Sequence, residues 1–221
     1  MSIAEEKCAP LSNASTLWNS RYNSRLDRIV SVDNDPWLER WSTILDAGRS
    51  GTVLELGCGG GRDSRYLTDL GLELISAEYS AAALELCRQR APLADARLID
   101  LRQPLPFDDG QFPIIVASLC LHYFPWTTTV AILAEIRRCL APGGFLLARV
   151  NSSGDIHHGA VGHPEVEPGL YRVDGELKRF FDREALDKLI GSEWHLHNRE
   201  ELTVYRYDSP KRLWEIVLQK R

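Results

Sequence analysis

Apolar and polar positions follow two alternating spacings from residue 52 onward. Short apolar runs of strand length alternate with longer stretches in which apolar residues recur every three or four positions, as on one face of a helix. Strand-like runs occur at residues 52–56, 72–77, 96–99, 112–118 and 144–150. Helix-like stretches occur between them at residues 61–69, 80–90 and 127–140. Apolar strands joined by crossover helices predict a parallel sheet with helices on both faces.

The chain after this core has a different pattern. Residues 151–169 are rich in Gly, His and Pro and predict a long loop, a kind of segment that is often functional in a compact domain. A helix is expected near residues 182–191, followed by strands at 194–206 and 213–219. The short, Pro-containing link between these two strands cannot hold a crossover helix. We therefore expect an antiparallel hairpin at the sheet edge.

The chain before the first strand has helical spacing. Residues 14–47 carry apolar and aromatic side chains at three- and four-residue intervals, and Pro36 opens a second helical segment. Trp18 and Tyr22 are about one turn apart, so they share a face. This face either packs on the core or closes as a lid over a ligand.

The turn after the first predicted strand consists almost entirely of glycine. Residues 53–63 are VLELGCGGGRD, so the turn is Gly57-Cys58-Gly59-Gly60-Gly61. Glycine permits positive φ and has no Cβ to hold a ligand away, and the following helix offers free N–H groups to an anionic group. Ligands of open parallel sheets bind outside the carboxyl ends of the strands, where this turn lies. The pattern predicts a ligand site, with a tight structural turn as the alternative.

An acid stands at the end of the second predicted strand. Glu78 lies about 20 residues past Gly57, where a carboxylate can accept both hydroxyls of a ribose. The dinucleotide fingerprint G-x-G-x-x-G would place its third glycine at position 62, which is Arg62, and no triphosphate-binding G-x-x-x-x-G-K-[ST] occurs. The spacing therefore predicts a nucleoside cofactor and disfavours a nicotinamide dinucleotide.

These segments together resemble the class I S-adenosylmethionine-dependent methyltransferases, in particular small bacterial members of unassigned substrate. VLELGCGGGRD is similar to their first motif and ISAEYS to their second, while LIDLRQPLPFDDGQFPIIVASLCLHYF resembles their third and fourth and LAPGGFLLARV their entry into the fifth strand. WNSRY and YRVDGELKRFFDREAL resemble segments outside that core. The family often has an acid after the aromatic that opens the fourth strand, whereas this chain has Pro113 after Phe112. Proline is tolerated at a strand start, so we expect no effect on the cofactor site.

The resemblance, which covers residues 15–150 well, implies an α/β fold: a doubly wound, mostly parallel seven-stranded sheet in the order 3-2-1-4-5-7-6, with the last strand antiparallel. We expect one methyltransferase domain over residues 1–221. Within it, residues 14–47 would form an N-terminal helical lid, residues 52–150 the cofactor-binding core, and residues 151–221 an acceptor loop and C-terminal hairpin.

The resemblance also implies cofactor contacts at particular residues. The methionine part of S-adenosylmethionine would lie against the glycine turn and the end of the fourth strand, at Gly57, Cys58, Gly59, Gly61, Ser118 and Leu119. Glu78 would bind the ribose, Tyr79 would pack beside the adenine, Asp100 would accept from the adenine amino group and the Leu101 backbone would lie against the ring. Trp18 and Tyr22 would close over the cofactor, with the Tyr22 hydroxyl near its carboxylate.

Other reactive side chains have two interpretations each. His122 follows the fourth strand, where it is either a general base at the pocket mouth or a locally packed histidine. His157, His158 and His163 match no metal-site spacing, so we expect no metal there.

Cys58 and Cys120, which flank the expected pocket, are expected to be small buried residues. A basic and aromatic group either forms a helix-start surface or faces an acidic acceptor; it consists of Arg172, Lys178, Arg179, Phe180 and Phe181.

Composition limits the partners. The 221 residues carry a net charge of −5, which does not favour broad binding to phosphate backbones, so we expect no nucleic-acid partner. Five cysteines without a C-x-x-C pair favour a reducing compartment. With no signal-peptide pattern and no apolar stretch of roughly 20 residues, we expect a cytoplasmic protein without a membrane partner.

The expected activity is methyl transfer from S-adenosylmethionine, with S-adenosylhomocysteine as product, to a small-molecule acceptor. The acceptor pocket would be built from residues 152–181, the turn at 120–125 and the N-terminal helix. A protein acceptor and a catalytically silent nucleoside-binding module are the alternatives.

Overall fold

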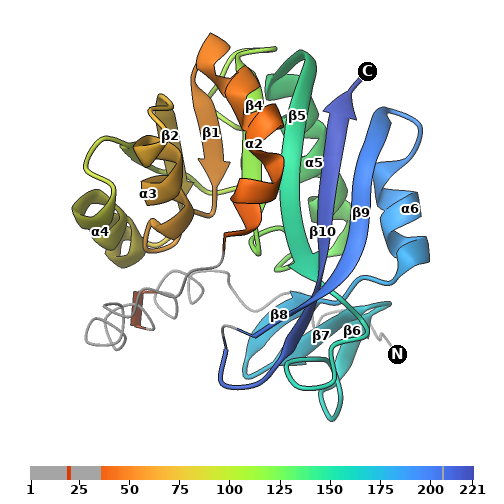
Figure 1. Ribbon diagram of the computed structural model, residues 1–221. Helices are drawn as coiled ribbons and strands as arrows, with labels where there is room; N and C mark the ends of the chain where they lie inside the picture. The colour runs from red at the N-terminus through yellow and green to blue at the C-terminus, as the bar shows by residue number, and fades with distance from the viewer. Residues whose placement is uncertain (1–18, 21–35, 206) are drawn as a thin grey trace, which may run out of the picture.

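The computed structural model describes residues 19–20, 36–205 and 207–221. Its main sheet has seven strands in the order β3-β2-β1-β4-β5-β10-β9 (Figure 1). These strands are β1 (Val53–Leu56), β2 (Leu74–Glu78), β3 (Asp95–Leu98), β4 (Phe112–Ser118), β5 (Leu140–Asn151), β9 (Trp194–Val204) and β10 (Lys211–Lys220). The pairs among β1–β5 are parallel, and β10 is antiparallel to both β5 and β9. Counted within this sheet, β9 is sixth and β10 seventh, so the predicted order and edge hairpin are confirmed.

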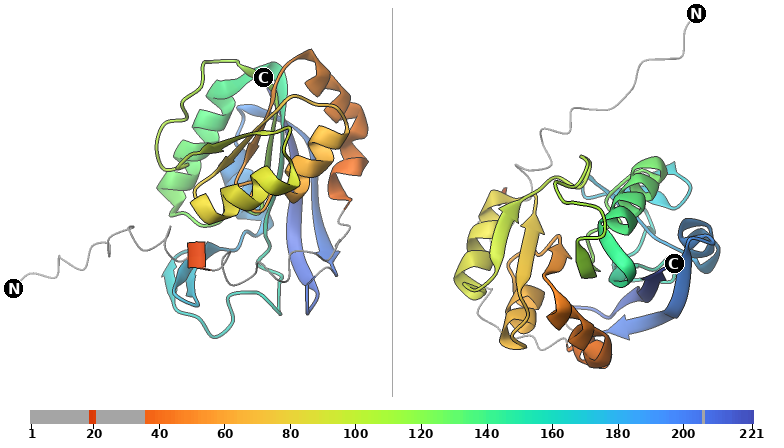
Figure 2. Two further views of the ribbon diagram at one scale, coloured as in Figure 1. Left: turned by 90° about the vertical axis from the view of Figure 1, so that its left-hand side faces the viewer. Right: turned by 90° about the horizontal axis from the view of Figure 1, so that it is seen from above.

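Helices cover both faces of the sheet (Figures 1 and 2). They are η2 (Trp37–Trp41), α2 (Ser42–Asp46), η3 (Ala47–Ser50), α3 (Arg62–Asp69), α4 (Ala81–Arg90), α5 (Trp126–Cys139) and α6 (Arg183–Ile190). Alternate strand residues enter two separate cores, as the period of two requires. Leu54 and Ile115 pack with residues of α5 and α6, while Val53 and Ile114 pack with residues of η2, α2 and α3. No helix in the described part of the chain is long and apolar enough to cross a membrane.

The proline at the start of β4 lies where the ladder is irregular. Pro113 is the second residue of β4, and the pairing with β5 shifts register between Phe112 and Ile114. A missing N–H is tolerated at such a position. Pro113, the departure from the family pattern, therefore affects only the amino end of β4, which is opposite the end that carries Ser118.

The prediction of a long loop over residues 151–169 is wrong for its last part, where a strand forms. Three short strands form a separate antiparallel sheet: β6 (Glu165–Glu167), β7 (Leu170–Val173) and β8 (Glu176–Arg179). Asp174 and Gly175 both have positive φ, at 53° and 84°, and form the two-residue turn between β7 and β8. An Asp-Gly pair in this conformation is a strong hairpin signal. This small sheet lies beyond the lower end of the main sheet in Figure 1, where β5 ends and its next residue, Ser152, bridges to Phe181.

The described part of the N-terminal segment reaches the start of α4. The side-chain oxygen of Asn19 accepts hydrogen bonds from Ser80 Oγ at 2.7 Å and from the Ala82 N–H at 3.1 Å. Trp18 and Tyr22, the two aromatic residues of the expected lid, lie outside the described residues. This contact places Asn19 close to the residues that follow Glu78.

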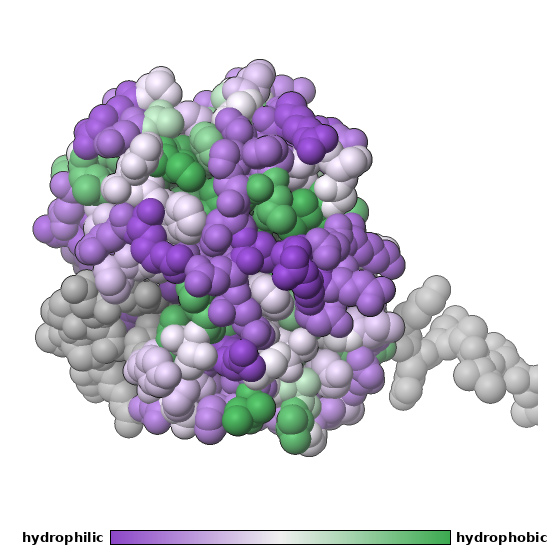
Figure 3. All heavy atoms as spheres, turned by 45° about the vertical axis from the view of Figure 1, so that its right-hand side comes forward, coloured by the Kyte–Doolittle hydropathy of each residue, from purple (hydrophilic) through white to green (hydrophobic). Residues whose placement is uncertain are grey.

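Hydrophilic residues cover most of the face shown in Figure 3, with smaller separate hydrophobic patches. Singly exposed apolar residues of this kind are normal on a globular protein.

Candidate functional site

The glycine turn after β1 depends on left-handed backbone conformations. Gly57, Gly59 and Gly61 have φ values of 65°, 53° and 76°. A Cβ at Gly57 would lie 2.3 Å from Cys120 Cβ, and one at Gly61 would lie 2.8 Å from Cys87 Cα. These two glycines are thus required by packing of the chain against itself as well as by their φ values.

Glu78 joins the end of β2 to this turn. One carboxylate oxygen accepts from the Gly59 N–H at 2.9 Å, and the other accepts from the N–H groups of Tyr79 at 2.8 Å and Ser80 at 2.9 Å. Burial raises the pKa of Glu78, and the three backbone hydrogen bonds oppose that rise. Two carboxylate oxygens offer about four acceptor positions, so Glu78 retains capacity for a further donor on the oxygen that faces Gly59.

Asp100, just after β3, is held by an arginine that the sequence analysis did not single out. Arg102 donates from its Nε to both carboxylate oxygens, at 2.8 and 3.0 Å, and from Nη2 at 2.6 Å. Burial raises the pKa of Asp100, but the bonds from Arg102 outweigh it and leave the pKa lowered. The same guanidinium lies 4.8 Å from the centre of the Tyr79 ring. Tyr79, Asp100 and Arg102 therefore form one group beside Glu78.

The end of β4 is strained at a non-glycine residue. Leu119 has φ of 57° and its N–H donates to the Arg149 carbonyl at 2.8 Å. Ser118 Oγ accepts from Arg149 Nε at 3.2 Å. A β-conformation is normal for such a residue, and a left-handed one marks sites that the surrounding structure enforces. This strained residue immediately precedes Cys120, which packs against Gly57.

His122 is buried and packs locally, which is the second of the two interpretations that the sequence allows. The residue is 2% exposed, its ring packs on Tyr123 with centroids 4.4 Å apart, and its Nδ1 has no partner among the described residues. Burial and, after it, Lys211 and Lys178 hold its pKa well below the usual value. The imidazole is therefore neutral and a weak base. Cys58 and Cys120 are buried, 7% and 9% exposed, as predicted.

The three loop histidines do not come together around a metal. Within the described ranges, no group of three His, Cys, Asp or Glu could hold a metal ion. Asp155, which is 2% exposed, accepts from the backbone N–H groups of His157 and His158. His158 Nε2 lies 3.0 Å from the Ser209 carbonyl. These contacts give Asp155 and His158 a structural role in ordering the segment.

Comparison with known proteins agrees with this arrangement. A methyltransferase-domain family model matches residues 53–144, the range that holds the glycine turn, Glu78, Asp100 and Ser118. An uncharacterized methyltransferase of Synechocystis is 33% identical over 92 residues, covering 42% of this chain and 43% of that protein. The malonyl-[acyl-carrier protein] O-methyltransferase of Enterobacter lignolyticus is 31% identical over 150 residues, covering 66% and 55%. Residues 53–144 therefore form a methyltransferase domain.

Solved structures of methyltransferases have the same fold as this chain. The Burkholderia thailandensis 1,6-didemethyltoxoflavin-N1-methyltransferase, solved with 1,6-didemethyltoxoflavin and S-adenosylhomocysteine, superposes with a TM-score of 0.67 at 20% identity, covering 100% of this chain and 98% of that one. A Methanosarcina mazei S-adenosylmethionine-dependent methyltransferase gives 0.66 at 19% identity, covering 76% and 92%. The chain matches about half the length of its first curated relatives.

Beneath the glycine turn, the protein contains a buried acid that sequence reasoning missed. Glu55 on β1 is 3% exposed and accepts from Ser64 Oγ at 2.5 Å and Ser76 Oγ at 3.1 Å. Burial, and then the charge of Asp63, raises the pKa of Glu55 to about 8. Its two serine partners lie on α3 and β2, so a carboxyl that is mostly protonated at neutral pH ties three elements together.

We expect this acid to make the folded protein less stable as pH rises. Between the ordinary carboxyl pKa of 4.5 and about 8, the folded state binds a proton that the unfolded state lacks. The stabilisation is complete below the lower value and is lost through the upper one, with a slope of about 1.4 kcal/mol per pH unit. Urea unfolding between about pH 6 and pH 8 measures it. Glu55→Gln should remove this slope, exposed Glu73→Gln should keep it, and equal slopes for wild type and Glu55→Gln would disprove the assignment.

Proposed function

We propose that this chain transfers the methyl group of S-adenosylmethionine to a small-molecule acceptor. The observation that carries the proposal is the link between Glu78 and the glycine turn, in which the Glu78 carboxylate accepts from the Gly59 N–H at 2.9 Å. It brings a partly buried acid, which can accept a further hydrogen bond, next to a turn in which four of the five residues are glycine. A ribose hydroxyl pair fits such a carboxylate, as a nucleoside cofactor requires.

The neighbouring residues support the same placement. Arg102 covers one face of the Tyr79 ring, so an adenine would pack on the other face or at its edge. Asp100 is already bonded to Arg102 through both oxygens. Asp100 would therefore mainly hold Arg102 in position beside Tyr79. It would accept from the adenine amino group only if Arg102 released one of the two Asp100 oxygens. The Leu101 backbone lies within this group.

The proposed catalysis depends on alignment more than on acid–base chemistry. The cofactor supplies a methyl group on a sulfonium, which is a good leaving group. The glycine turn and the end of β4, at Ser118 and Leu119, would hold the amino-acid end, while the strained Leu119 backbone fixes that end of the strand. Holding two reactants in line contributes several kcal/mol to a barrier reduction. His122, buried with a depressed pKa, would accept a proton only from an acidic acceptor group.

A small acceptor is supported by two observations. The net charge of −5 does not favour nucleic acid, and one solved structure with the same fold contains 1,6-didemethyltoxoflavin. The curated relatives include a malonyl-[acyl-carrier protein] O-methyltransferase, whose named substrate is attached to a carrier protein. A protein-borne acceptor is therefore the competing candidate.

Incubation of the protein with cofactor tritiated on its methyl group and a size-fractionated bacterial extract tests the proposal. We expect label in the small-molecule fraction, and loss of that label with the Glu78→Ala variant. Label only in macromolecules would replace the small acceptor by a protein-borne one. Absence of label in every fraction would favour a silent binding module.

A further inference from the structure

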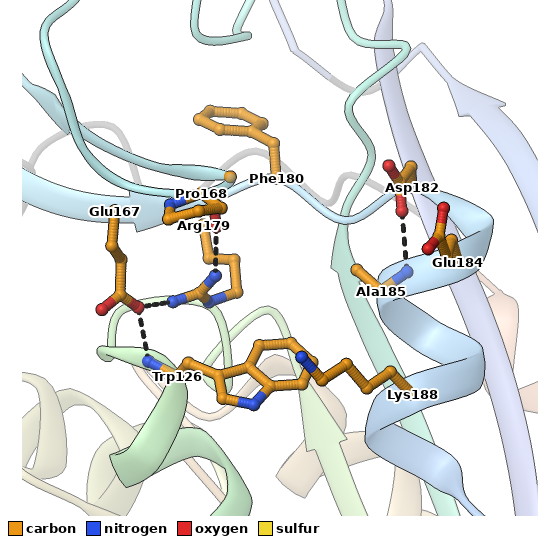
Figure 4. Close-up of a pocket in the computed structure, with 10 residues that line it drawn as sticks. Trp126, Glu167, Pro168, Arg179, Phe180, Asp182, Glu184, Ala185 and Lys188 are labelled. Atoms are coloured by element: carbon orange, nitrogen blue, oxygen red, sulfur yellow. Dashed lines mark hydrogen bonds and ion pairs between the residues drawn. The ribbon is translucent and has the colours of Figure 1, made fainter.

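A cavity lies beside the turn that follows β4. It has a volume of about 380 Å³, and its lining includes Trp126, Glu167, Arg179 and Lys188 (Figure 4). This volume falls within the usual range for small-molecule sites. The walls come from the start of α5, the link between β6 and β7, the end of β8 and the start of α6. Because the Arg179 N–H donates to the His122 carbonyl at 2.7 Å, the cavity adjoins the expected acceptor side.

A buried arginine in this cavity has an unused donor. Arg179 is 2% exposed; its Nη1 donates to the Pro168 carbonyl at 2.9 Å and its Nη2 to Glu167. Its Nε has no hydrogen-bond partner among the described residues. Buried N–H groups nearly always find a partner. In Figure 4 the guanidinium lies between Glu167 and the Trp126 ring, inside the space that the ten lining residues enclose.

A second cation reaches the same place from α6. Lys188 Nζ lies 5.3 Å from the centre of the Trp126 ring, and Arg179 Cζ lies at the same distance of 5.3 Å. Lys188 has no carboxylate at ion-pair distance in the described part of the chain, whereas Glu167 is taken by Arg179 and by the Trp126 N–H at 2.6 Å. Two cations beside one ring, with one of them unpaired, attract an anion.

Two acids, Asp182 and Glu184, line the end of the cavity at the start of α6, and one of them already accepts a hydrogen bond. Asp182 caps α6 by accepting from the Ala185 N–H at 2.7 Å, and Glu184 is an exposed residue in the first turn. Both appear at the start of α6 in Figure 4, apart from the Arg179 guanidinium. Trp126, Pro168 and Ala185 supply apolar surface between the two ends.

We propose, on the basis of the proposed function, that this cavity anchors a carboxylate of the methyl acceptor. One carboxylate oxygen accepts from Arg179 Nε, Lys188 pairs with the charge, and an apolar body lies along Trp126, Pro168 and Ala185. The anchoring carboxylate is not the methylated group. The acceptor is therefore a small organic acid that remains anionic after the reaction.

Binding of simple acids tests the cavity independently of methyl transfer. The probes are phenylacetate and indole-3-acetate, with phenylacetamide, indole-3-acetamide and tryptamine as comparisons, followed by protein-observed NMR. We expect each acid to bind roughly tenfold more tightly than its amide, since a charge-assisted bond is lost in the amide. Lys188→Met should weaken acid binding several-fold and leave amide binding unchanged. Arg183→Met, the same charge change on α6 outside the cavity lining, should change neither.

Several results would overturn the anchor. They are equal binding of acids and amides, tighter binding of tryptamine than of either acid, no binding of any acid at millimolar concentration, and unchanged acid affinity in Lys188→Met. Titration of S-adenosylhomocysteine into each variant separates the two proposals, because loss of the anchor leaves cofactor affinity intact. The tritiated product supplies a further readout: retention on an anion-exchange resin at neutral pH supports the anchor, and a neutral or cationic product contradicts it.

Discussion

Glu78→Ala is expected to weaken S-adenosylhomocysteine binding by roughly ten- to hundredfold. The substitution removes the carboxylate that we place on the ribose hydroxyls, and hydrogen bonds to a charged group contribute roughly 1.5–3 kcal/mol. It also leaves the N–H groups of Gly59, Tyr79 and Ser80 without their shared acceptor. Both effects act at the cofactor, and isothermal titration calorimetry measures their sum.

Two variants separate these effects. Glu78→Gln keeps one oxygen for the backbone donors but loses the charge, so we expect an affinity between those of wild type and Glu78→Ala. Glu73→Ala removes an exposed acid just before the same strand, where, among the described residues, the side chain accepts only from Thr52 at 3.4 Å. It should bind like wild type. Wild-type affinity in Glu78→Ala would show that Glu78 does not contact the cofactor.

Gly57→Ala is expected to destabilise the fold by roughly 2–5 kcal/mol. The left-handed backbone costs a residue with a Cβ roughly 1–2 kcal/mol, and forcing extra atoms into a packed core costs typically 1–3 kcal/mol. The new methyl would lie 2.3 Å from Cys120 Cβ, so either the glycine turn or the end of β4 has to move. Urea unfolding monitored by circular dichroism measures the loss.

Gly175→Ala is the matched control. Gly175 also has positive φ, at 84°, but a Cβ there would meet nothing within 4 Å. It should therefore show only the backbone term, roughly 1–2 kcal/mol. Similar losses at both glycines would mean that the close packing between the glycine turn and Cys120 contributes little to stability.

The core of the fold could be predicted because the spacing of apolar residues within each short segment indicates whether that segment is a strand or a helix. Apolar runs marked β1 to β5, and helical spacing marked α3 to α5. The observed boundaries lie within two residues of the expected ones except at β5, which begins at Leu140, four residues before its expected start. The small sheet β6–β8 was missed although its Asp174-Gly175 turn has a recognisable sequence signal. Its strands are only three or four residues long, and the Gly, His and Pro residues before them suggested a loop.

The sequence predicted where the site lies in the fold better than it predicted which side chains contact one another there. The sequence placed the glycine turn, Glu78, Asp100 and the end of β4 at one edge of a sheet, because parallel strands bring their carboxyl ends together. It missed Arg102 and Glu55, whose roles depend on partners brought near by folding, and it named Arg179 only as one member of a basic and aromatic group. It left His122 as either a general base or a locally packed residue, and the structure buries the ring against Tyr123. The contacts proposed for Trp18 and Tyr22 stay predictions, since both lie outside the described residues.

The most direct test of the central claim is calorimetric titration of the wild-type protein with S-adenosylhomocysteine, S-adenosylmethionine and NAD. The account predicts that both sulfur nucleosides bind to one site per chain and that NAD does not, since position 62 is Arg where a dinucleotide site needs its third glycine. Binding of NAD without binding of either sulfur nucleoside would contradict it.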